Sequence, residues 1–544
     1  MFKKHILPII STLVLGGIYY YVALPPIHYK SQEFWSGVLF LVIVYVLSML
    51  FFRGTFKQKL FTAESPSPGA PPKITANFHI GKRIKVIIIS VVAVIVAVVA
   101  IVSVSSSRFF NATKYQQMLD VKERDFTEDI SEIPLSQIPI VDRDTAVRLG
   151  SRKIGEVVEL VSQFDVSDYY TQINFKQKPV RVSPLQYDGV VKWFFNRADG
   201  IPYYVKIDMA TQETELVKLQ ENMKYSPSEL FSRDLVRHVR FKYPTKMIGE
   251  ISFEIDDNSK PFWVLPYYDY TIGVIGGKDI QGIIVVDAIT GDMINYPILE
   301  VPQWIDRVYP ADIVLSQANN WGSLKNGYIN SVFAQKNVVK TTDGYTYLAL
   351  DDDVWLYTGL TSVVSDKSNI GFLLVNMRTK EGKLYSINGA EEFSAMESAR
   401  GVVQEKRYSA TFPILVNIAD TPSYFISLKD DAGLVKAYSF VSVANYQIVG
   451  VADTMEGAEA DYRRLLGVES PKPAAPAPAE TTDVSGIITR ISSAVRDGNS
   501  IYFIEIGGKI YTAEIKISGK LPLLAINDKI DFSATAENVI TAIK

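Results

Sequence analysis

Three stretches of membrane-spanning length lie within the first 106 residues of this 544-residue chain. They are residues 6–24, 34–52 and 84–105, and the last one reads IKVIIISVVAVIVAVVAIVSVS. Each is about as long as the apolar core of a bilayer is thick, and none carries a charge beyond its first few residues. Helices in the core of a soluble protein are shorter and amphipathic. The sequence therefore predicts a membrane region, residues 1–106, with three transmembrane helices.

The basic residues between these stretches predict their orientation. The N-terminal tip has Lys3 and Lys4, and the loop 25–33 has Lys30 balanced by Glu33. Against the single acid Glu64, the loop 53–83 has six basic residues, which are Arg53, Lys57, Lys59, Lys73, Lys82 and Arg83. Short basic loops stay in the cytoplasm. We therefore expect a multi-pass protein of a bacterial cytoplasmic membrane, with its N-terminus and loop 53–83 inside and all residues from 108 onward outside.

The composition excludes several classes of chemistry. The chain has no cysteine, which excludes disulfides and thiolate metal sites. It has four histidines, and only His238 lies beyond the membrane region, so a histidine-based triad or zinc site is not expected there. A net charge of −3 gives no electrostatic footprint for nucleic acid. We predict a protein that is not an enzyme, with no catalytic residues, cofactor or metal.

A Pro/Ala segment divides the predicted exterior part in two. Residues 469–482 read ESPKPAAPAPAETT, a composition typical of extended linkers. This linker separates an ectodomain, 108–468, from a C-terminal module, 483–544. A second proline-rich run, SPSPGAPPK, lies in the basic loop at 65–73.

One hairpin pattern recurs in the ectodomain, in which a strand ends at Asp or Asn, Thr follows three residues later, and a second strand returns. The copies are 203–217 with Asp208 and Thr211, 283–296 with Asp287 and Thr290, 372–385 with Asn376 and Thr379, and a degenerate 438–451 with Asn445 at the place of Thr. Apolar alternation around a polar turn predicts a hairpin. The Asp or Asn side chain caps such a turn by accepting from backbone N–H groups.

A stretch with helical character precedes each hairpin, at residues 142–164, 226–241, 310–333 and 389–404. Further short strands are expected between helix and hairpin. The sequence thus predicts an α+β fold of about four tandem units, each with a helix on one face of an antiparallel sheet.

These units resemble PepSY-type domains. The resemblance is carried by GIPYYVKID at 200–208 and by GIIVVDAITGD at 282–292. The first copy lacks the Gly after Thr211, and the third has Asn376 in place of Asp. The resemblance implies a role in interaction with secreted hydrolases or proteases, or in envelope assembly. It implies no catalytic residues.

The C-terminal module resembles a small OB-like β-barrel. Five strands are expected at 485–491, 501–506, 509–515, 529–534 and 539–543. OB folds often bind single-stranded nucleic acid through aromatic residues and a basic groove. Here seven basic residues face seven acidic ones, so no nucleic-acid partner is expected, and a protein- or glycan-binding role is favoured.

Two further groups of residues have competing interpretations. Asp351, Asp352 and Asp353 favour a solvated hairpin turn, with a metal site as the alternative. Clustered aromatic residues pack sheets against helices in most proteins, but they also dominate binding surfaces. A possible interaction surface on this basis consists of Trp263, Tyr267, Tyr268, Trp304 and Trp321.

Together these features predict a membrane-anchored, extracytoplasmic binding or scaffold protein. Its expected partners are the membrane, envelope proteins such as a hydrolase or protease, or copies of itself. An envelope hydrolase with an acidic pair is one alternative. A sensor or transporter accessory subunit is another, although the three apolar stretches contain no ionisable residue in their interior.

Overall fold

The computed structural model describes residues 2–52, 62–64, 73–75, 82–132, 134–363, 365–468, 481–496, 499–535 and 538–544. Most of the basic loop 53–83 and of the Pro/Ala linker 469–482 lies outside these residues. The chain divides into two compact units, Met1–Val468 and Glu469–Lys544. Each unit is described by itself.

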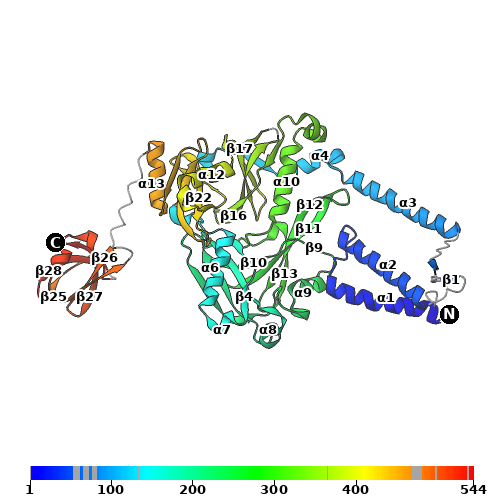
Figure 1. Ribbon diagram of the computed structural model, residues 1–544, viewed down its shortest axis with the longest axis horizontal. Coiled ribbons are helices and arrows are strands. Elements are labelled where there is room, and N and C mark those ends of the chain that lie inside the picture. Colours follow the sequence, from blue (N-terminus) through cyan, green and yellow to red (C-terminus); the bar gives the residue numbers. More distant parts are fainter. Residues whose placement is uncertain are drawn as a thin grey trace. The chain divides into compact units, whose positions relative to one another are not determined.

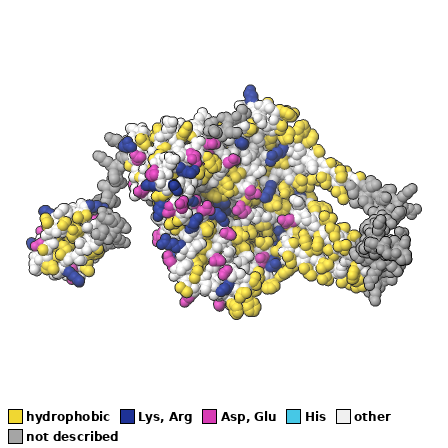
Figure 2. All heavy atoms as spheres, viewed as in Figure 1, with side chains coloured by type: hydrophobic (Ala, Val, Ile, Leu, Met, Phe, Trp, Pro, Cys, Tyr) yellow, Lys and Arg dark blue, Asp and Glu magenta, His cyan; other side chains and the backbone are white. Residues whose placement is uncertain are grey.

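Three N-terminal helices are long and apolar enough to cross a membrane. They are α1 (Phe2–Ala23), α2 (Gln32–Phe52) and α3 (Lys82–Ser105). The third apolar span continues through α4 (Arg108–Gln116). Strands β1 (Thr62–Glu64) and β2 (Lys73–Thr75) pair between α2 and α3. Hydrophobic side chains cover α1 and α2 on the right of Figure 2, whereas charged side chains of both signs gather over the sheets. The predicted membrane-length helices are confirmed in length and composition.

Four sheets follow the helices in the first unit, and all their strand pairs but one are antiparallel (Figure 1). The first sheet consists of β4 (Phe164–Val166), β5 (Thr171–Phe175), β6 (Lys178–Tyr187), β7 (Ile201–Asp208) and β8 (Thr214–Met223). Its helices are α6 (Arg143–Gly155), α7 (Val158–Val161) and α8 (Gly189–Asn196). The helix expected over 142–164 is thus divided into α6 and α7 and ends where β4 begins.

The second sheet follows a shorter helix than expected. It contains β9 (Met247–Ile248), β10 (Ser252–Ile255), β11 (Pro261–Ile272), β12 (Gly276–Asp287) and β13 (Met293–Pro297). Of the expected helix at 226–241, η2 (Phe231–Arg233) and α9 (Leu235–Lys242) form. Asp234 caps α9 by accepting from the Arg237 N–H at 2.8 Å. Helix formation therefore starts later than the Ser-Pro-Ser-Glu sequence at 226–229 suggests.

The third sheet has seven strands. Its strands are β14 (Val339–Thr341), β15 (Thr346–Leu350), β16 (Asp353–Ser362), β17 (Ser365–Asn376), β18 (Gly382–Tyr385), β19 (Gly389–Ala390) and β3 (Val121–Glu123). Strand β3 lies parallel to β18, while the other pairs are antiparallel. Before this sheet come η3 (Ile298–Glu300), α10 (Ala311–Ser323), α11 (Gly327–Ile329) and a short π-helix η4 (Asn330–Ala334).

The fourth sheet completes the first unit. Its strands are β20 (Ser409–Ala410), β21 (Ile414–Ile418), β22 (Thr421–Lys429), β23 (Val435–Ser442) and β24 (Val449–Ala452). Helices α12 (Glu392–Val402) and α13 (Met455–Leu466) both pack against β23 and β24. Shorter helical turns are α5 (Phe126–Asp129), η1 (Leu135–Gln137) and η5 (Gln404–Lys406).

All four sheets share one topology. In each, two short strands pair with the same first long strand, a second long strand pairs antiparallel with the first, and a return strand pairs with the second. In the first sheet α8 connects the two long strands. The short pairs are β4 and β5 on β6, β9 and β10 on β11, β14 and β15 on β16, and β20 and β21 on β22. The mixed α+β class with several small antiparallel sheets is therefore confirmed, and the four units repeat in connectivity.

The Asp and Asn residues of the recurrent turn cap it as predicted, and the Thr residues add a second bond. The Asp287 carboxylate accepts from the N–H groups of Ile289 and Thr290 at 2.8 and 3.1 Å. The Thr290 hydroxyl then accepts from the Asp292 N–H at 3.2 Å. Asp208 with Thr211, and Asn376 with Thr379, make the same two kinds of bond. Both side chains of the pattern thus satisfy backbone donors that the turn leaves unpaired.

The degenerate fourth copy uses different side chains for the same bonds. The Ser442 hydroxyl accepts from the Asn445 N–H at 3.2 Å. It thus takes the place of Asp287, which accepts from the N–H of Thr290, also three residues later. The Asn445 side-chain oxygen accepts from the Gln447 N–H at 3.1 Å, in the way that Thr accepts in the other copies.

The second and third sheets are buried on both faces. Along β11 and β16 the side chains alternate between two hydrophobic clusters, with Trp263 and Tyr357 in the larger one and Val264 and Leu356 in the other. Because successive strand residues point to opposite faces, each strand contributes to both clusters. The larger cluster also contains the cores of the first and fourth sheets, so one core joins all four units.

The second compact unit is a five-stranded antiparallel sheet. Its strands are β25 (Thr481–Arg496), β26 (Asn499–Ile506), β27 (Lys509–Glu514), β28 (Lys529–Thr535) and β29 (Ile540–Ile543), in the order β27-β26-β25-β28-β29. Two helical turns, η6 (Ile515–Ile517) and η7 (Leu521–Leu523), follow β27. The two end strands of this sheet, β27 and β29, do not pair with each other along their length. One isolated bridge, Thr512 to Val539, connects β27 to the residue before β29, so the described strands form no closed barrel. The five strands occur where expected, but the expected barrel closure does not.

Candidate functional site

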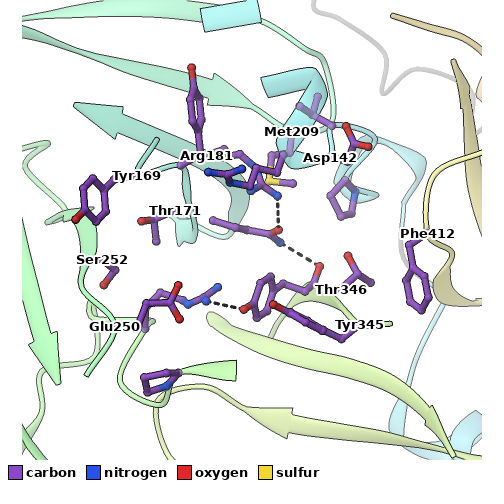
Figure 3. Close-up of a pocket in the computed structure, with 18 of the residues that line it drawn as sticks. Asp142, Tyr169, Thr171, Arg181, Met209, Glu250, Ser252, Tyr345, Thr346 and Phe412 are labelled. Atoms are coloured by element: carbon purple, nitrogen blue, oxygen red, sulfur yellow. Dashed lines mark hydrogen bonds between the residues drawn. The ribbon is translucent and has the colours of Figure 1, made fainter. Parts of the chain in front are cut away.

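A pocket of about 580 Å³ lies where segments of all four sheets of the first unit meet. It is lined from the first sheet by residues such as Thr171 and Arg181, from the second by Ser252, from the third by Thr346 and from the fourth by Ile414. Figure 3 shows Thr171, Arg181, Ser252 and Thr346 around the pocket. We call this the central pocket. Its volume falls within the range of small-molecule sites.

Arg181 provides the most deeply buried charge in the central pocket. It lies in β6 between Val180 and Val182 and pairs in register with Gln172 of β5. The residue is 8% exposed, and its Nη2 donates to the Gln172 side-chain oxygen at 3.3 Å. Its Nε is buried and has no hydrogen-bond acceptor among the described residues. Burial lowers the pKa of Arg181 to about 10, and the nearby Arg307 adds to this.

Arg307 enters the same pocket from the segment between η3 and α10. Its Nη2 donates to the Tyr347 hydroxyl at 2.6 Å, and its guanidinium lies 3.9 Å from the centre of that ring. Glu254 holds the backbone, because its carboxylate accepts from the Asp306 and Arg307 N–H groups at 2.9 and 3.2 Å. Burial alone would lower the pKa of Arg307, but Tyr347, Glu250 and Glu254 outweigh it and raise that pKa.

A hydrogen-bonded wall connects the two arginines. From Arg181 it passes to Gln172, whose side-chain amide donates to the Tyr347 carbonyl at 3.1 Å, and Tyr347 in turn accepts from Arg307. The wall therefore joins β6 and β5 of the first sheet to β15 of the third. Each member is held by the next, which fixes the guanidiniums before any ligand arrives.

The acids that line the central pocket do not contact these arginines. Asp142 forms an ion pair with Lys429 at 2.5 Å and caps α6 through the Thr145 N–H. Asp168 and Glu250 are exposed. Among the residues that the structure describes, neither Arg181 nor Arg307 has a carboxylate oxygen within 4.0 Å. The donors at this wall thus outnumber the acceptors, an arrangement suited to binding an anion.

Two of the five members of the predicted aromatic surface lie in the hydrophobic core. Trp263 is 0% exposed and Tyr267 is 6% exposed, and both belong to the larger hydrophobic cluster. Trp263 packs on Phe253, and its indole N–H donates to the Tyr225 carbonyl. These rings lie in a sheet that is covered on both faces, so they cannot meet a partner. The other three predicted members, Tyr268, Trp304 and Trp321, are half-buried against the smaller cluster.

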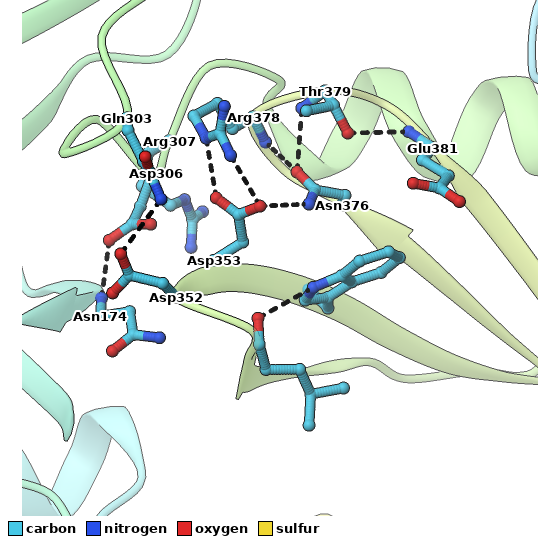
Figure 4. Close-up of polar contacts among 12 residues, drawn as sticks. Asn174, Gln303, Asp306, Arg307, Asp352, Asp353, Asn376, Arg378, Thr379 and Glu381 are labelled. Atoms are coloured by element: carbon cyan, nitrogen blue, oxygen red, sulfur yellow. Dashed lines mark hydrogen bonds and ion pairs between the residues drawn. The ribbon is translucent and has the colours of Figure 1, made fainter. Parts of the chain in front are cut away.

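The acidic run at 351–353 is a turn followed by a buried ion pair. Asp351 and Asp352 have φ of 51° and 66° and form the turn between β15 and β16. Asp353 is 7% exposed and accepts from Arg378 Nε and Nη2 at 2.7 and 2.8 Å and from the Asn376 amide at 2.8 Å (Figure 4). The expected hairpin turn is confirmed, although its last carboxylate is not solvated. Among the described residues no cluster of potential metal ligands occurs.

In the second unit, two of the aromatic residues that could stack on a ligand are core residues. Tyr511 is 7% exposed and Phe532 is 0% exposed, and their ring centres lie 5.0 Å apart. Phe503 is 38% exposed.

Sequence reasoning did not find the central pocket. The one local signal was Arg181, a charge within the strand sequence KPVRVSPLQY at 178–187. A charged residue between two valines of a buried strand needs a partner or a ligand. Arg307 and Gln172 gave no such signal, because their role depends on contacts between distant sheets.

Comparisons with known proteins add no identification. No protein family model matches the chain, and no curated protein matches it. Among solved structures, a GH43_1 enzyme from Xanthomonas citri is 10% identical over 73% of this chain and 96% of its own, with a TM-score of 0.17. A mutant levansucrase from B. megaterium is 8% identical over 76% of this chain and 97% of its own, with a TM-score of 0.16. Likenesses this weak carry no argument about fold or function.

Proposed function

We propose that the protein is a membrane-anchored binding protein whose four-sheet body lies outside a bacterial cytoplasmic membrane. The body engages envelope proteins or further copies of the chain, without catalysis. The PepSY-like character of the four units and the OB-like character of the second unit belong to this proposal. The single observation that carries it is the way in which the three apolar helices attach to the body.

The loop between α1 and α2 is attached to the second sheet and α9. The Ile27 N–H donates to the Pro244 carbonyl at 2.7 Å. Lys30 forms an ion pair with Asp269 at 3.0 Å and donates to the Tyr270 carbonyl at 2.7 Å. This loop is the one that charge counting places outside the membrane.

The C-terminal end of α3 is attached to the same sheet. The buried Ser106 hydroxyl accepts from the Val274 and Ile275 N–H groups at 3.0 Å each, in the turn between β11 and β12. The Tyr115 hydroxyl donates to the Ser106 carbonyl at 2.7 Å. Three helix ends that the positive-inside rule assigns to one side of the membrane thus meet one sheet. The contacts support a common side for these ends and the body, and the charge rule alone favours the exterior as that side.

Helix α8 offers a surface for a protein partner. Four of its eight residues are large, apolar and 54–76% exposed, namely Val190, Val191, Phe194 and Phe195. Its buried side is held by Trp193, whose indole N–H donates to the buried Glu229 carboxylate at 2.8 Å. Contiguous exposed apolar side chains of this kind mark interaction sites. This surface takes the place of the aromatic cluster that the sequence suggested.

The second unit provides a further contact in this proposal. If residues 469–482 form the extended tether that their composition predicts, a weak interaction of the second unit gains from a raised effective concentration.

Capture of partners from envelope extracts tests the proposal. Full-length protein in detergent is used as bait, and light scattering measures self-association. We expect a protein partner or self-association that is lost when Phe194 and Phe195 are both replaced by Asn. The matched control is Val158→Asn, a single exposed apolar residue at 78% exposure. Recovery of no partner together with a monomeric protein would contradict the proposal.

A further inference from the structure

The central pocket contains a buried arginine without a counter-ion. Among the described residues three arginines are buried, and the two other than Arg181 have hydrogen-bond or ion-pair partners. Arg463 forms ion pairs with Glu132 and Glu459, and Arg240 donates to the carbonyls of Leu24 and Lys246. Arg181 makes one long hydrogen bond to a neutral amide. Removing a guanidinium from water without pairing it is costly, so such a residue calls for a functional reason.

The second guanidinium makes the arrangement more costly still. Arg307 faces the same pocket and lies close enough to lower the pKa of Arg181. Like charges that share a pocket repel each other, and this repulsion is relieved when an anion lies between them. Glu254 compensates Arg307 in part from the side of the backbone, but it does not reach Arg181.

The remaining lining suits the organic part of a small ligand. Tyr169, Tyr345, Phe412 and Met209 present aromatic and apolar surface around the pocket, with hydroxyls from Thr171 and Thr346 (Figure 3). A few fixed polar groups among apolar side chains are the usual composition of a small-molecule site.

We propose that the central pocket binds a small organic anion, whose carboxylate or phosphate group is held by Arg181 and Arg307. Arginine presents a planar set of donors that matches either group with two parallel hydrogen bonds. Gln172 and Tyr347 position the two guanidiniums through the wall described above. The inference goes beyond the proposed function and is independent of it, because the pocket lies within the first unit whichever side of the membrane that unit occupies.

Thermal unfolding of the full-length protein in detergent tests this inference. The probes are inorganic phosphate and citrate, each titrated at constant ionic strength against chloride. We expect a saturable rise in Tm with at least one probe. A response to phosphate alone assigns a phosphate ligand, a response to citrate alone assigns a carboxylate, and a response to both supports a site for either group.

Two variants make the test specific. Arg181→Met keeps the apolar part of the side chain, removes the charge and abolishes the rise in Tm, while leaving the ligand-free Tm equal to or above that of the native protein. Arg307→Gln weakens probe binding by roughly 10- to 100-fold, the loss typical of a charged hydrogen bond. The control Arg152→Met, at an exposed position of α6, leaves binding unchanged.

Three results would overturn the inference. The first is the absence of a saturable rise with either probe. The second is an equal rise in the native protein and in Arg181→Met. The third is a clearly lower ligand-free Tm in Arg181→Met, because that result would make the guanidinium a structural element. Each is distinguishable from failure of the partner capture, which does not involve the pocket.

Discussion

Arg240 of α9 donates from its Nε to the backbone carbonyl of Leu24, which lies 3.0 Å away at the end of α1. The residues are separated by 216 positions, and both are buried. A residue of the body therefore supplies the donor for a carbonyl that the end of a membrane-length helix leaves without an intrahelical partner.

Replacing Arg240 by Met is expected to loosen this attachment. The Leu24 carbonyl loses its charged donor, so we expect the free energy of unfolding to fall by about 2 kcal/mol. Limited proteolysis of the loop 25–31 and thermal unfolding measure the effect. The exposed Arg152→Met serves as control, and equal effects of the two substitutions would show that the contact is not stabilising.

The ion pair between Asp142 and Lys429 predicts that the fold loses stability in acid. Burial alone would raise the pKa of Asp142, but the Lys429 ammonium and the Thr145 N–H outweigh it and lower that pKa. The carboxylate therefore stabilises the fold above its unfolded pKa of about 4, and this contribution is lost as the pH falls.

Asp142→Asn retains a side-chain oxygen for the helix cap and removes the ion pair. We expect it to lower stability at pH 7 by about 2 kcal/mol, and we expect this difference to shrink as the pH falls below about 4 toward the lowered pKa of the folded-state carboxylate. Thermal unfolding at several pH values measures this convergence. Asp144→Asn, at an exposed position of the same helix, should show no such pH dependence.

A Gly→Ala substitution should destabilise the protein more at Gly291, which is closely packed, than at Gly467, which is open. Gly291 has φ of +81°, and a Cβ there would lie 2.3 Å from the Tyr225 ring. Gly467 has φ of +75° with nothing within 4 Å of the added atom. We expect Gly467→Ala to cost about 1 kcal/mol through backbone strain alone and Gly291→Ala to cost about 3 kcal/mol, since overpacking adds to that strain. Chemical denaturation compares them, and similar costs would contradict the tight contact.

Substitutions of the neighbouring residues Asp352 and Asp353 should differ sharply in their effect on stability. Asp353→Asn leaves the half-buried Arg378 without its anion, so we expect a loss of about 3 kcal/mol. Asp352 is a partly exposed turn residue whose carboxylate accepts from the Gln303 amide at 3.2 Å. Asp352→Asn keeps an oxygen acceptor and should alter stability by less than about 0.5 kcal/mol. Thermal unfolding of both variants decides this, and addition of calcium should stabilise neither the native protein nor the variants.

Much of the fold could be predicted because its signals are local. The Asp287 and Thr290 side chains act on backbone groups within three residues, so their spacing alone indicates the turn. Strands such as β26 and β27 alternate in polarity, and their turn contains Gly507 and Gly508, both with positive φ. Membrane-length helices are equally visible, because hydrophobicity over some twenty residues needs no tertiary context.

The parts that could not be predicted depend on contacts between distant segments. The parallel pairing of Val121 with Gly382 joins residues more than 250 positions apart, and no local pattern announces it. The burial of Trp263 follows from coverage of both faces of its sheet, which the periodicity of one strand does not show. The meeting of Arg181 and Arg307 in one pocket likewise depends on how the sheets pack together.

The side of the membrane on which the body lies is the central claim, and the absence of cysteine makes it directly measurable. Single cysteines are introduced as Ser65→Cys in the basic loop and Ser162→Cys at an exposed position of the body. Intact spheroplasts are then treated with a membrane-impermeant maleimide. The account predicts labelling at 162 in intact spheroplasts and at 65 only after lysis. Labelling at 65 but not at 162 before lysis would contradict it.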